Sequence, residues 1–242
     1  VAKRSSDNQN RELKTGMIEV KIKEFESLSS AKELPMPVFG EQDYPEDIRL
    51  KYRFIDLRRN EMHENIKLRS EVLSFLRTEM VKNNFLEFQT PILTASSPEG
   101  ARDFLVPSRL HKGRFYALPQ SPQLFKQLLM VAGMDRYYQI AKCFRDEDSR
   151  ADRQPEFTQL DIEASFVNES DVMDTAEGMI RALFHEVLEV DLPSPFVRMS
   201  FGDALARYGT DRPDLRIPFE FVGVADLVRN VAFKLFAGPA DT

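Results

Sequence analysis

The sequence contains no tryptophan and only one cysteine among its 242 residues. The lone cysteine, Cys143, excludes a disulfide framework within the chain and weakly indicates a reducing compartment. The three histidines, His63, His111 and His185, are scattered, and the segment HEVLE at 185–189 lacks the second histidine of a zinc-binding helix. We therefore expect neither a disulfide-stabilised domain nor a zinc site.

Long apolar runs are also missing from the sequence. No stretch of about 18 apolar residues occurs, so we expect no membrane span, no membrane partner and a cytoplasmic location. The first ten residues, VAKRSSDNQN, lack the apolar core of a signal peptide. They also lack an initiating methionine, and the last residues, KLFAGPADT, stop without completing an element. We therefore expect the chain to be a fragment.

Neither sign of charge dominates the sequence. The 33 Lys and Arg residues and the 39 Asp and Glu residues give a formal net charge of −6. This balance argues against a general nucleic-acid coat or a membrane-surface binder, although local basic patches remain compatible with it. The hydrophobic and charged fractions, 42% and 30%, are ordinary for a soluble globular protein. The length suffices for one large domain or two smaller ones.

The N-terminal part predicts one strand and a proline-containing connection. Residues 15–28 alternate Ile18, Val20 and Ile22 with charged residues, which predicts a strand with one buried face. Residues 27–47 contain three prolines together with polar and small residues. This connection is either a linker between two domains or a plain loop.

Three segments predict helices. The clearest is 47–84, which Asn83 and Asn84 would end. Apolar residues recur in it at helical spacing at Ile66, Leu73, Leu76 and Met80. The segments 121–133 and 168–190 follow. In the former, Ser121 is a plausible N-cap, Pro122 the first helical residue and Gly133 the end.

Strands are predicted between these helices. The aromatic-rich stretch 85–93 contains Pro91, which should lie at a strand end or at a sheet edge because proline lacks an N–H. A short strand around RFYAL precedes the second helix, and a strand at 135–144 follows it. From Gln159 to Phe166 polar and apolar residues alternate strictly, which predicts a strand over 157–166 with one polar face. These strands and helices indicate an α+β fold with an antiparallel sheet. The sequence has no GxGxxG motif and no P-loop, and its element order differs from that of a Rossmann fold.

The loop 145–156 between the last two strands is heavily charged. Such a loop is often merely solvated, but Arg145 directly follows a strand of mainly apolar residues, so its guanidinium can lie over the sheet. Asp161 and Glu163 project from one face of the partner strand. An arginine suits a pair of carboxylate or phosphate oxygens, and a carboxylate suits an ammonium group. Together they indicate a site for a zwitterion and a phosphate ester.

Several stretches resemble one enzyme family. The segment FRDEDSRADRQPEFTQLDIE resembles motif 2 of the class II aminoacyl-tRNA synthetases, and NNFLEFQTPIL resembles motif 1. SPEGARDF and LPQSPQLFKQLLM are similar to the substrate-side loops of the aspartate-specific members of bacterial and mitochondrial type. Lysyl- and asparaginyl-type relatives share the framework but typically differ beside the arginine and in the PEGARD loop. Together, in this order, the motifs are strongly specific, and the resemblance runs along nearly the whole chain.

The resemblance implies an antiparallel-sheet class II catalytic core with helices, preceded by the tail of an OB-type β-barrel. The expected division is a remnant of the anticodon-binding OB domain at 1–35, a hinge at 36–60, the catalytic core with motifs 1 and 2 at 61–212, and the start of an insertion domain at 213–242. Nothing resembles motif 3, so we expect this chain by itself to be inactive.

The resemblance also implies site residues. Those implied for aspartate are Glu99, Ser121, Gln123, Lys126, Arg145 and Asp161. Those implied for ATP are Arg145, Asp146, Glu147, Gln154 and Phe157. Arg145, the implied catalytic residue, would bridge the amino-acid carboxylate and the α-phosphate, and Lys126 would select the side-chain carboxylate. The alternatives are a surface lysine at 126, a surface arginine at 145 and a core phenylalanine at 157.

The implied reaction joins L-aspartate and ATP into aspartyl-adenylate, which then esterifies tRNA(Asp). Mg²⁺ would accompany ATP, near Glu147, and tRNA(Asn) is a further partner if the anticodon-binding face allows it. A homodimer is implied through the unit 62–91, with Phe88 and Pro91 at the interface. A non-catalytic binding protein that keeps the fold is the alternative, although Arg145, Gln123 and Lys126 are all present. An amide-forming asparagine synthetase is disfavoured by the OB-type remnant TGMIEV.

Overall fold

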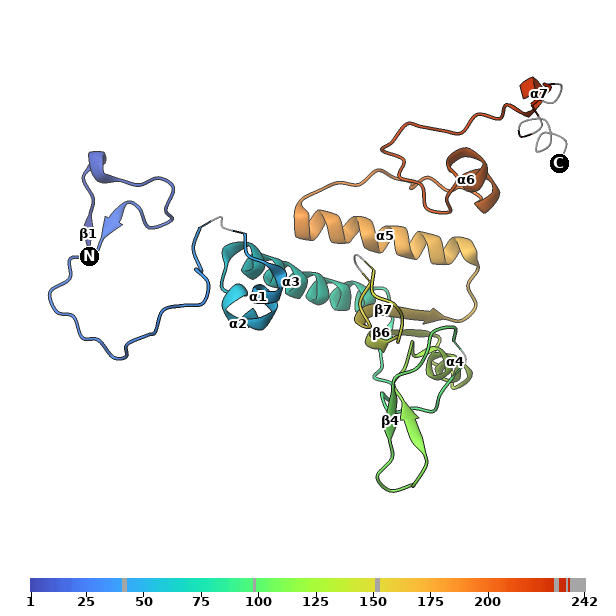
Figure 1. Cartoon of the computed structure of the whole chain (residues 1–242), viewed down its shortest axis with the longest axis horizontal. Helices are drawn as coiled ribbons and strands as arrows, with labels where there is room; N and C mark the ends of the chain where they lie inside the picture. The colour runs from blue at the N-terminus through green and yellow to red at the C-terminus, as the bar shows by residue number, and fades with distance from the viewer. Residues whose placement is uncertain (41–42, 98, 151–152, 229–230, 234, 236–242) are drawn as a thin grey trace. The chain divides into compact units, whose positions relative to one another are not determined.

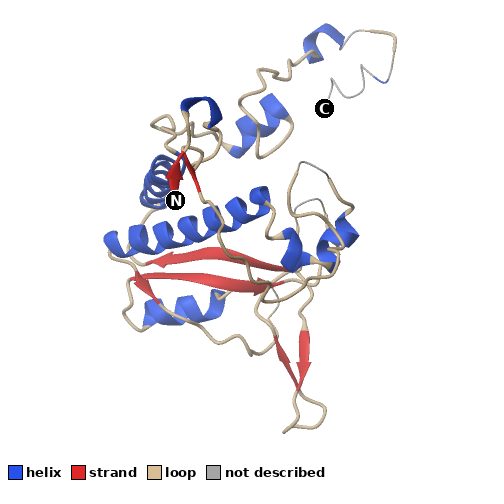
Figure 2. Cartoon of the chain, turned by 90° about the vertical axis from the view of Figure 1, so that its left-hand side faces the viewer, coloured by secondary structure: helices blue, strands red, loops and turns tan. Residues whose placement is uncertain are grey.

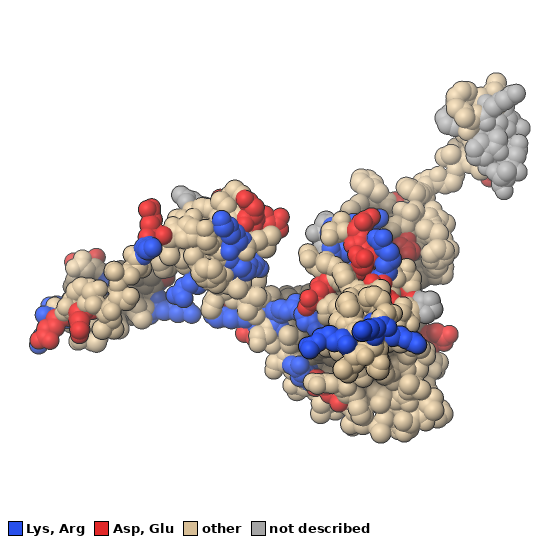
Figure 3. Space-filling view, turned by 60° about the horizontal axis from the view of Figure 1, so that its bottom comes forward, with Lys and Arg blue, Asp and Glu red and all other residues tan. Residues whose placement is uncertain are grey.

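The computed structural model describes residues 1–40, 43–97, 99–150, 153–228, 231–233 and 235. It divides into two compact units, Val1–Leu68 and Arg69–Thr242 (Figure 1). This boundary lies within a helix, so it is a division of contacts and leaves the expected domain limits untested. Acidic and basic side chains are interspersed on the face drawn in Figure 3, as expected for a chain whose net charge is only −6.

The first unit contains little regular structure before residue 45. Strands β1 (Ala2–Lys3) and β2 (Ile18–Glu19) form a two-stranded antiparallel pair around the short 3₁₀ helix η1 (Ser6–Asn8). The strand expected at 15–28 is thus reduced to two residues. Val20 and Ile22 are 69% and 77% exposed, because the alternating segment meets no apolar surface in this unit. The described residues do not show an OB-type barrel tail.

A buried carboxylate organises the helices that follow. Helices α1 (Glu46–Lys51) and α2 (Arg53–Asp56) precede the long α3 (Asn60–Lys82). The side chain of Asp56 is fully buried and forms ion pairs with Arg49, Arg53 and Arg59 at 3.1, 2.6 and 3.7 Å. A buried charge needs such partners. The single helix expected at 47–84 is interrupted at Tyr52, whose φ of −112° and ψ of 42° lie outside the helical region, and again by the turn at 57–59, so three helices replace it.

The second unit is built on a three-stranded sheet in the order β3–β6–β7. Strands β6 (Arg136–Phe144) and β7 (Glu156–Ala164) pair antiparallel over their full length, from Arg136 opposite Ala164 to Phe144 opposite Glu156. Strand β3 (Leu86–Glu87) runs parallel to β6, so the expectation of an antiparallel sheet holds for the two long strands only. A parallel neighbour is possible here because β3 and β6 are separated by a long connection that contains α4 (Gln123–Val131).

The two faces of this sheet have different partners. On the apolar face Met80 of α3, Phe85 and Tyr138 form a core against which Ile162 and Met179 pack. Met179 belongs to α5 (Glu169–Leu188), which packs on this face, whereas α4 lies on the opposite face of the sheet (Figure 2). The period of two in β6 and β7 therefore directs the polar side chains toward α4.

The remaining elements lie outside this layered core. Strands β4 (Leu105–Pro107) and β5 (Phe115–Ala117) form a hairpin that projects from the sheet in Figure 1. Helices α6 (Phe201–Tyr208) and α7 (Ala225–Val228) follow α5. No helix within the described ranges is long and apolar enough to cross a membrane.

Candidate active site

The polar face of the sheet carries the central group of the site. Helix α4 lies on this face and directs Lys126 at β7, where its Nζ lies 3.0 Å from Asp161 Oδ1 and 3.3 Å from Glu163 Oε2. The side chains of Lys126 and Asp161 are only 11% and 6% exposed. Lys126 is thus a buried cation between two carboxylates, which excludes a surface lysine.

Burial and charge act in opposite directions on Lys126. Desolvation lowers its pKa, but the hydrogen bond and charge of Asp161, followed by those of Glu163, outweigh burial and leave the pKa raised. Lys126 therefore carries its charge at neutral pH. The Oδ2 atom of Asp161 is buried without a hydrogen-bond partner among the described residues. A buried carboxylate oxygen without a donor is costly, so this atom is suited to receive a donor from a ligand.

Two acidic protons lie close to the same carboxylate. Burial and the negative charge of Asp161 raise the pKa of the Cys143 thiol to about 11, and they raise that of Tyr137 as well. Both side chains are fully buried in β6. The Tyr137 hydroxyl donates to Gln139 Oε1 at 2.9 Å. The floor of the site thus combines the charged Lys126 with the protonated thiol of Cys143 and the protonated hydroxyl of Tyr137.

A second group lies where the chain enters α4. Helix α4 begins at Gln123 with Pro122 in the N-cap position, so the expectation that Ser121 caps it is wrong. The Ser121 hydroxyl instead donates to Glu99 Oε2 at 2.8 Å, and Ser97 donates to Glu99 Oε1 at 3.1 Å. Glu99 and Ser121, which the sequence assigns to one substrate, are therefore in direct contact.

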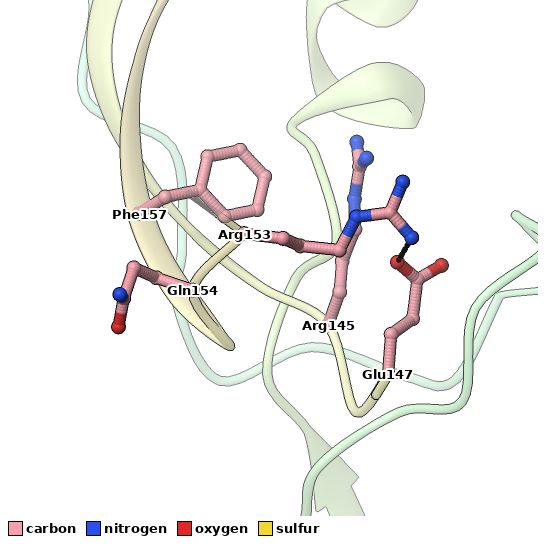
Figure 4. Close-up of a pocket in the computed structure, with 5 residues that line it drawn as sticks. All are labelled: Arg145, Glu147, Arg153, Gln154 and Phe157. Atoms are coloured by element: carbon pink, nitrogen blue, oxygen red, sulfur yellow. Dashed lines mark hydrogen bonds and ion pairs between the residues drawn. The ribbon is translucent and has the colours of Figure 1, made fainter. Parts of the chain in front are cut away.

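The third group surrounds a cavity of about 430 Å³ at the end of β6 and the start of β7. Arg145, Glu147, Arg153, Gln154 and Phe157 line it. The Arg145 guanidinium carbon lies 5.1 Å from the centre of the Phe157 ring, and Arg153 Nη1 lies 3.3 Å from Glu147 Oε2. Figure 4 shows the Arg153 guanidinium against Glu147 and the Arg145 guanidinium beside that of Arg153, whereas the Gln154 amide points away from them. A phenyl face beside two arginines offers stacking and phosphate binding in one cavity.

The backbone fixes Arg145 in this cavity. Its N–H donates to the Pro155 carbonyl at 2.8 Å, which closes the charged loop at its base. Asp146 N–H donates to the Arg102 carbonyl at 3.0 Å, so the loop before β4 and the loop after β6 are joined. Asp146 does not line this cavity; with Arg102 it lines a separate hollow, to which Glu147 and Arg153 also contribute. Residues 151–152 of the charged segment are outside the described residues.

The sequence reasoning did not assign three residues that belong to these groups. Glu163, which the alternation placed beside Asp161 in the expected site but which was assigned to neither substrate, shares Lys126 with Asp161. Arg153 pairs with Glu147, but nothing distinguishes it by sequence from its charged neighbours. Gln120, buried before α4, offers no pattern at all. Gln123, which the sequence did assign, lies three residues before Lys126 at the start of α4.

The whole arrangement can be compared with known proteins. A family model described as tRNA synthetases class II (D, K and N) matches residues 45–233. The chain belongs to this family. The catalytic-core expectation is thereby confirmed at the level of the family.

Three curated relatives of this chain have the same name. It is 59% identical over 239 residues to an "Aspartate--tRNA(Asp/Asn) ligase" of Phenylobacterium zucineum (strain HLK1). It is 57% and 58% identical to proteins of the same name from Parvibaculum lavamentivorans (strain DS-1 / DSM 13023 / NCIMB 13966) and Sinorhizobium fredii (strain NBRC 101917 / NGR234). Each match covers 98% of this chain and 40% of the relative. The chain thus spans about two fifths of the length of these relatives.

Proposed function

We propose that this chain is the aspartate- and ATP-binding part of an aspartate–tRNA ligase. The observation that carries the proposal is the buried, charged Lys126 beside the carboxylates of Asp161 and Glu163. The names of relatives that are 57–59% identical to it support the same function.

Lys126 gives the site its selectivity. The side-chain carboxylate of aspartate accepts from the ammonium group of Lys126, whereas the amide of asparagine presents only one neutral acceptor and an NH₂ group that Lys126 cannot accept. The unpartnered Oδ2 of Asp161 receives the α-ammonium group, together with Ser121 and Gln123. Glu99 closes this side, held by Ser121. A zwitterion with a second carboxylate thus finds a partner for each charge.

The cavity lined by Arg145, Glu147 and Phe157 receives ATP. The adenine stacks on the face of Phe157 against which the Arg145 guanidinium packs in this structure. Because a cation–π contact contributes only about 1 kcal/mol, the much larger charge of a phosphate draws Arg145 away from the ring. Arg145 then bridges the α-phosphate and the α-carboxylate of aspartate, and Glu147 and Gln154 contact the nucleotide.

The chemistry needs no protein nucleophile. The aspartate α-carboxylate attacks the α-phosphorus of ATP and pyrophosphate leaves, which forms aspartyl-adenylate. The terminal hydroxyl of the tRNA then attacks the acyl carbon and AMP leaves. Arg145 acts by positioning the two reactants and by stabilising the charge of the transferring phosphate.

Mg²⁺ is proposed to enter with the nucleotide. Within the described residues, no three Asp, Glu, His or Cys side chains come together as a metal site. Mg²⁺ commonly binds through phosphates, waters and one or two carboxylates. Glu147, an acid at the cavity with Arg145, fits the role of that single carboxylate.

Both tRNA(Asp) and tRNA(Asn) are proposed as acceptors in the complete protein. The relatives' names include both, and the catalytic groups described above contact only aspartate and ATP. Aspartylation of the two purified tRNAs in parallel tests this point. Charging of tRNA(Asp) alone would leave the first part of the proposal intact and remove the second.

Amino-acid-dependent ATP–pyrophosphate exchange tests the function itself. The complete gene product is assayed with aspartate, asparagine and lysine in parallel. We expect exchange with aspartate and at least 100-fold less with the others. A folded protein that is silent with all three would overturn the proposal in favour of a binding protein that keeps the synthetase fold.

A further inference from the structure

Gln120 is a buried amide that the proposed chemistry does not use. Only 2% of it is exposed, and it lies between β5 and α4, directly before Ser121. The flanking backbone is fixed on both sides. Leu118 N–H donates to the Phe104 carbonyl, and the Pro119 carbonyl accepts from Phe144 N–H, each at 2.9 Å. The side chain of Gln120 therefore projects from a rigid position.

All three hydrogen bonds of this amide go to one loop. Gln120 Oε1 accepts from Ala101 N–H at 3.1 Å, and Nε2 donates to the Ala101 carbonyl at 2.9 Å. The second Nε2 hydrogen is directed at Asp103 Oδ1, 2.5 Å away. Asp103 Oδ2 accepts in turn from Ser96 at 2.5 Å, which fixes the carboxylate for Gln120. Gln120 thus pairs with the main chain of Ala101 as a neighbouring strand would, and both of its donors are satisfied.

The residues on either side of Ala101 reach both halves of the site. Glu99, two residues earlier, contacts Ser121 at the aspartate side. Arg102, the next residue, accepts from Asp146 N–H, which directly follows Arg145 at the ATP side. Arg102 has its own bond to Asp146 N–H at the ATP side, so the position that depends on Gln120 and Ala101 is that of Glu99 beside Ser121.

We propose that Gln120 is a positioning residue that holds the segment 99–103 closed over the site, so that Glu99 completes the pocket for the amino acid. The proposal rests on the proposed function, since the closed pocket is the aspartate pocket. Gln120 does not contact the reactants, and it acts through Ala101 and Asp103. An amide is required because only an amide both accepts from and donates to the same peptide unit.

The substitution Gln120→Glu tests this requirement. It keeps size and shape, removes both donors and places a second carboxylate beside Asp103. A carboxylate at position 120 can still accept from Ala101 N–H, but it loses the bonds to the Ala101 carbonyl and to Asp103 and is repelled by Asp103, which should release the segment. We therefore expect hydrogen exchange at the Ala101 amide in the 242-residue chain to accelerate at least tenfold. In the complete protein we expect the KM for aspartate in pyrophosphate exchange to rise at least tenfold, while the KM for ATP changes less than twofold. The matched control is Gln127→Glu on the exposed side of α4, which should change neither measurement.

A double variant separates positioning from general damage. Gln120→Glu combined with Asp103→Asn exchanges the two groups: the carboxylate is then at position 120 and the amide that donates to it is at position 103. We expect it to recover part of the aspartate KM, whereas a general folding defect would not be recovered. Unchanged exchange at Ala101 in Gln120→Glu, or equal rises in both KM values, would overturn the proposal. The exchange at Ala101 does not depend on the substrate, so it remains decisive even if the complete protein activates another amino acid.

Discussion

Asp161 connects the ionisable groups at the floor of the site. Its Oδ1 binds Lys126 at 3.0 Å, and burial, followed by the charge of Asp161, raises the pKa values of Cys143 and Tyr137. Asp161 therefore helps to keep the lysine charged and adds to the burial that keeps the two acids protonated. The polar floor is consequently sensitive to single substitutions and to alkaline pH.

Replacing Lys126 should affect both activity and stability. Lys126→Met removes the cation from the buried Asp161 and the partly exposed Glu163, and an unpaired buried charge such as that of Asp161 typically costs about 3 kcal/mol or more. We expect this loss in urea unfolding at pH 7, together with at least a 100-fold loss of aspartate-dependent exchange. Lys142→Met is the control, because Lys142 pairs with Glu156 on the surface, where both side chains are more than half exposed. Equal effects of the two substitutions would place Lys126 outside the site.

Alkaline pH should destabilise the fold through the same cluster. Cys143 and Tyr137 have raised pKa values in the folded chain, so unfolding releases their protons once the pH exceeds the unfolded values. The folded state holds the thiol proton up to a pKa of about 11, against a usual value of 9.0. The stability contributed by this group is therefore complete below pH 9 and is lost as the pH rises toward 11. Lys126, whose pKa is raised from 10.5, acts in the same direction at higher pH.

Urea unfolding between pH 7 and pH 11 measures this dependence. The loss of unfolding free energy above pH 9 should be smaller in Cys143→Ala combined with Tyr137→Phe than in the unaltered chain. Tyr116→Phe, on the projecting hairpin, should leave the curve unchanged. A double variant with the full alkaline loss would assign that loss to other groups.

At the scale of elements, α5 owes its start to a reciprocal cap. Asn168 Oδ1 accepts from Asp171 N–H at 3.1 Å, and Asp171 Oδ2 accepts from Asn168 N–H at 2.9 Å. Asn168→Ala should cost about 1 kcal/mol in urea unfolding, because orphan donors at the helix start lose an acceptor. Asn168→Ser should retain most of the stability, and Ser170→Ala should have no effect. A harmless Asn168→Ala would mean that packing alone fixes this end of α5.

The elements that the sequence predicted best are those with a complete local pattern. The strands expected at 135–144 and 157–166 match β6 and β7 to within two residues at each end, because their side chains alternate between a buried and a polar face. The helix expected at 168–190 matches α5 similarly. The strand at 85–93 is much shorter than expected, because Thr90 N–H donates to the Gln139 side chain and Pro91 has no N–H. A side-chain acceptor 49 residues away leaves no local signal.

The residues of the candidate site also fall into those with a local sequence signature and those that only the tertiary structure brings together. Arg145 and Asp161 were predictable, because an arginine after an apolar strand and acids in alternation have local signatures. The contact of Ser121 with Glu99 and the pairing of Gln120 with Ala101 join segments that are about 20 residues apart. Local reasoning gave Ser121 the role of a helix cap, since a serine before a proline commonly has it. Only the tertiary structure reveals that the Ser121 hydroxyl donates to the carboxylate of Glu99 instead.

At the scale of the whole molecule, the edge of the sheet at β3 is suited to contact a second copy of the chain. In the described part of the sheet, β3 is an outer strand, and an unpaired strand edge invites association. Leu86, Ile92 and Leu93 are 53%, 49% and 54% exposed, so an apolar surface accompanies this edge. The sequence resemblance led to the same segment, through Phe88 and Pro91.

We therefore predict that the complete protein is a homodimer and that the double variant Phe88→Ala, Pro91→Ala is a monomer in size-exclusion chromatography with light scattering. Phe88 also stacks on Tyr137 within its own chain, with ring centres 6.4 Å apart, so this variant alone does not separate the interface from the fold. Ile92→Asp places a charge on the exposed apolar surface without altering that stacking. It should also give a monomer. At concentrations low enough for the unaltered protein to be monomeric too, the unfolding curves of the two proteins should be the same. If both variants remain dimeric, the subunits associate through another surface.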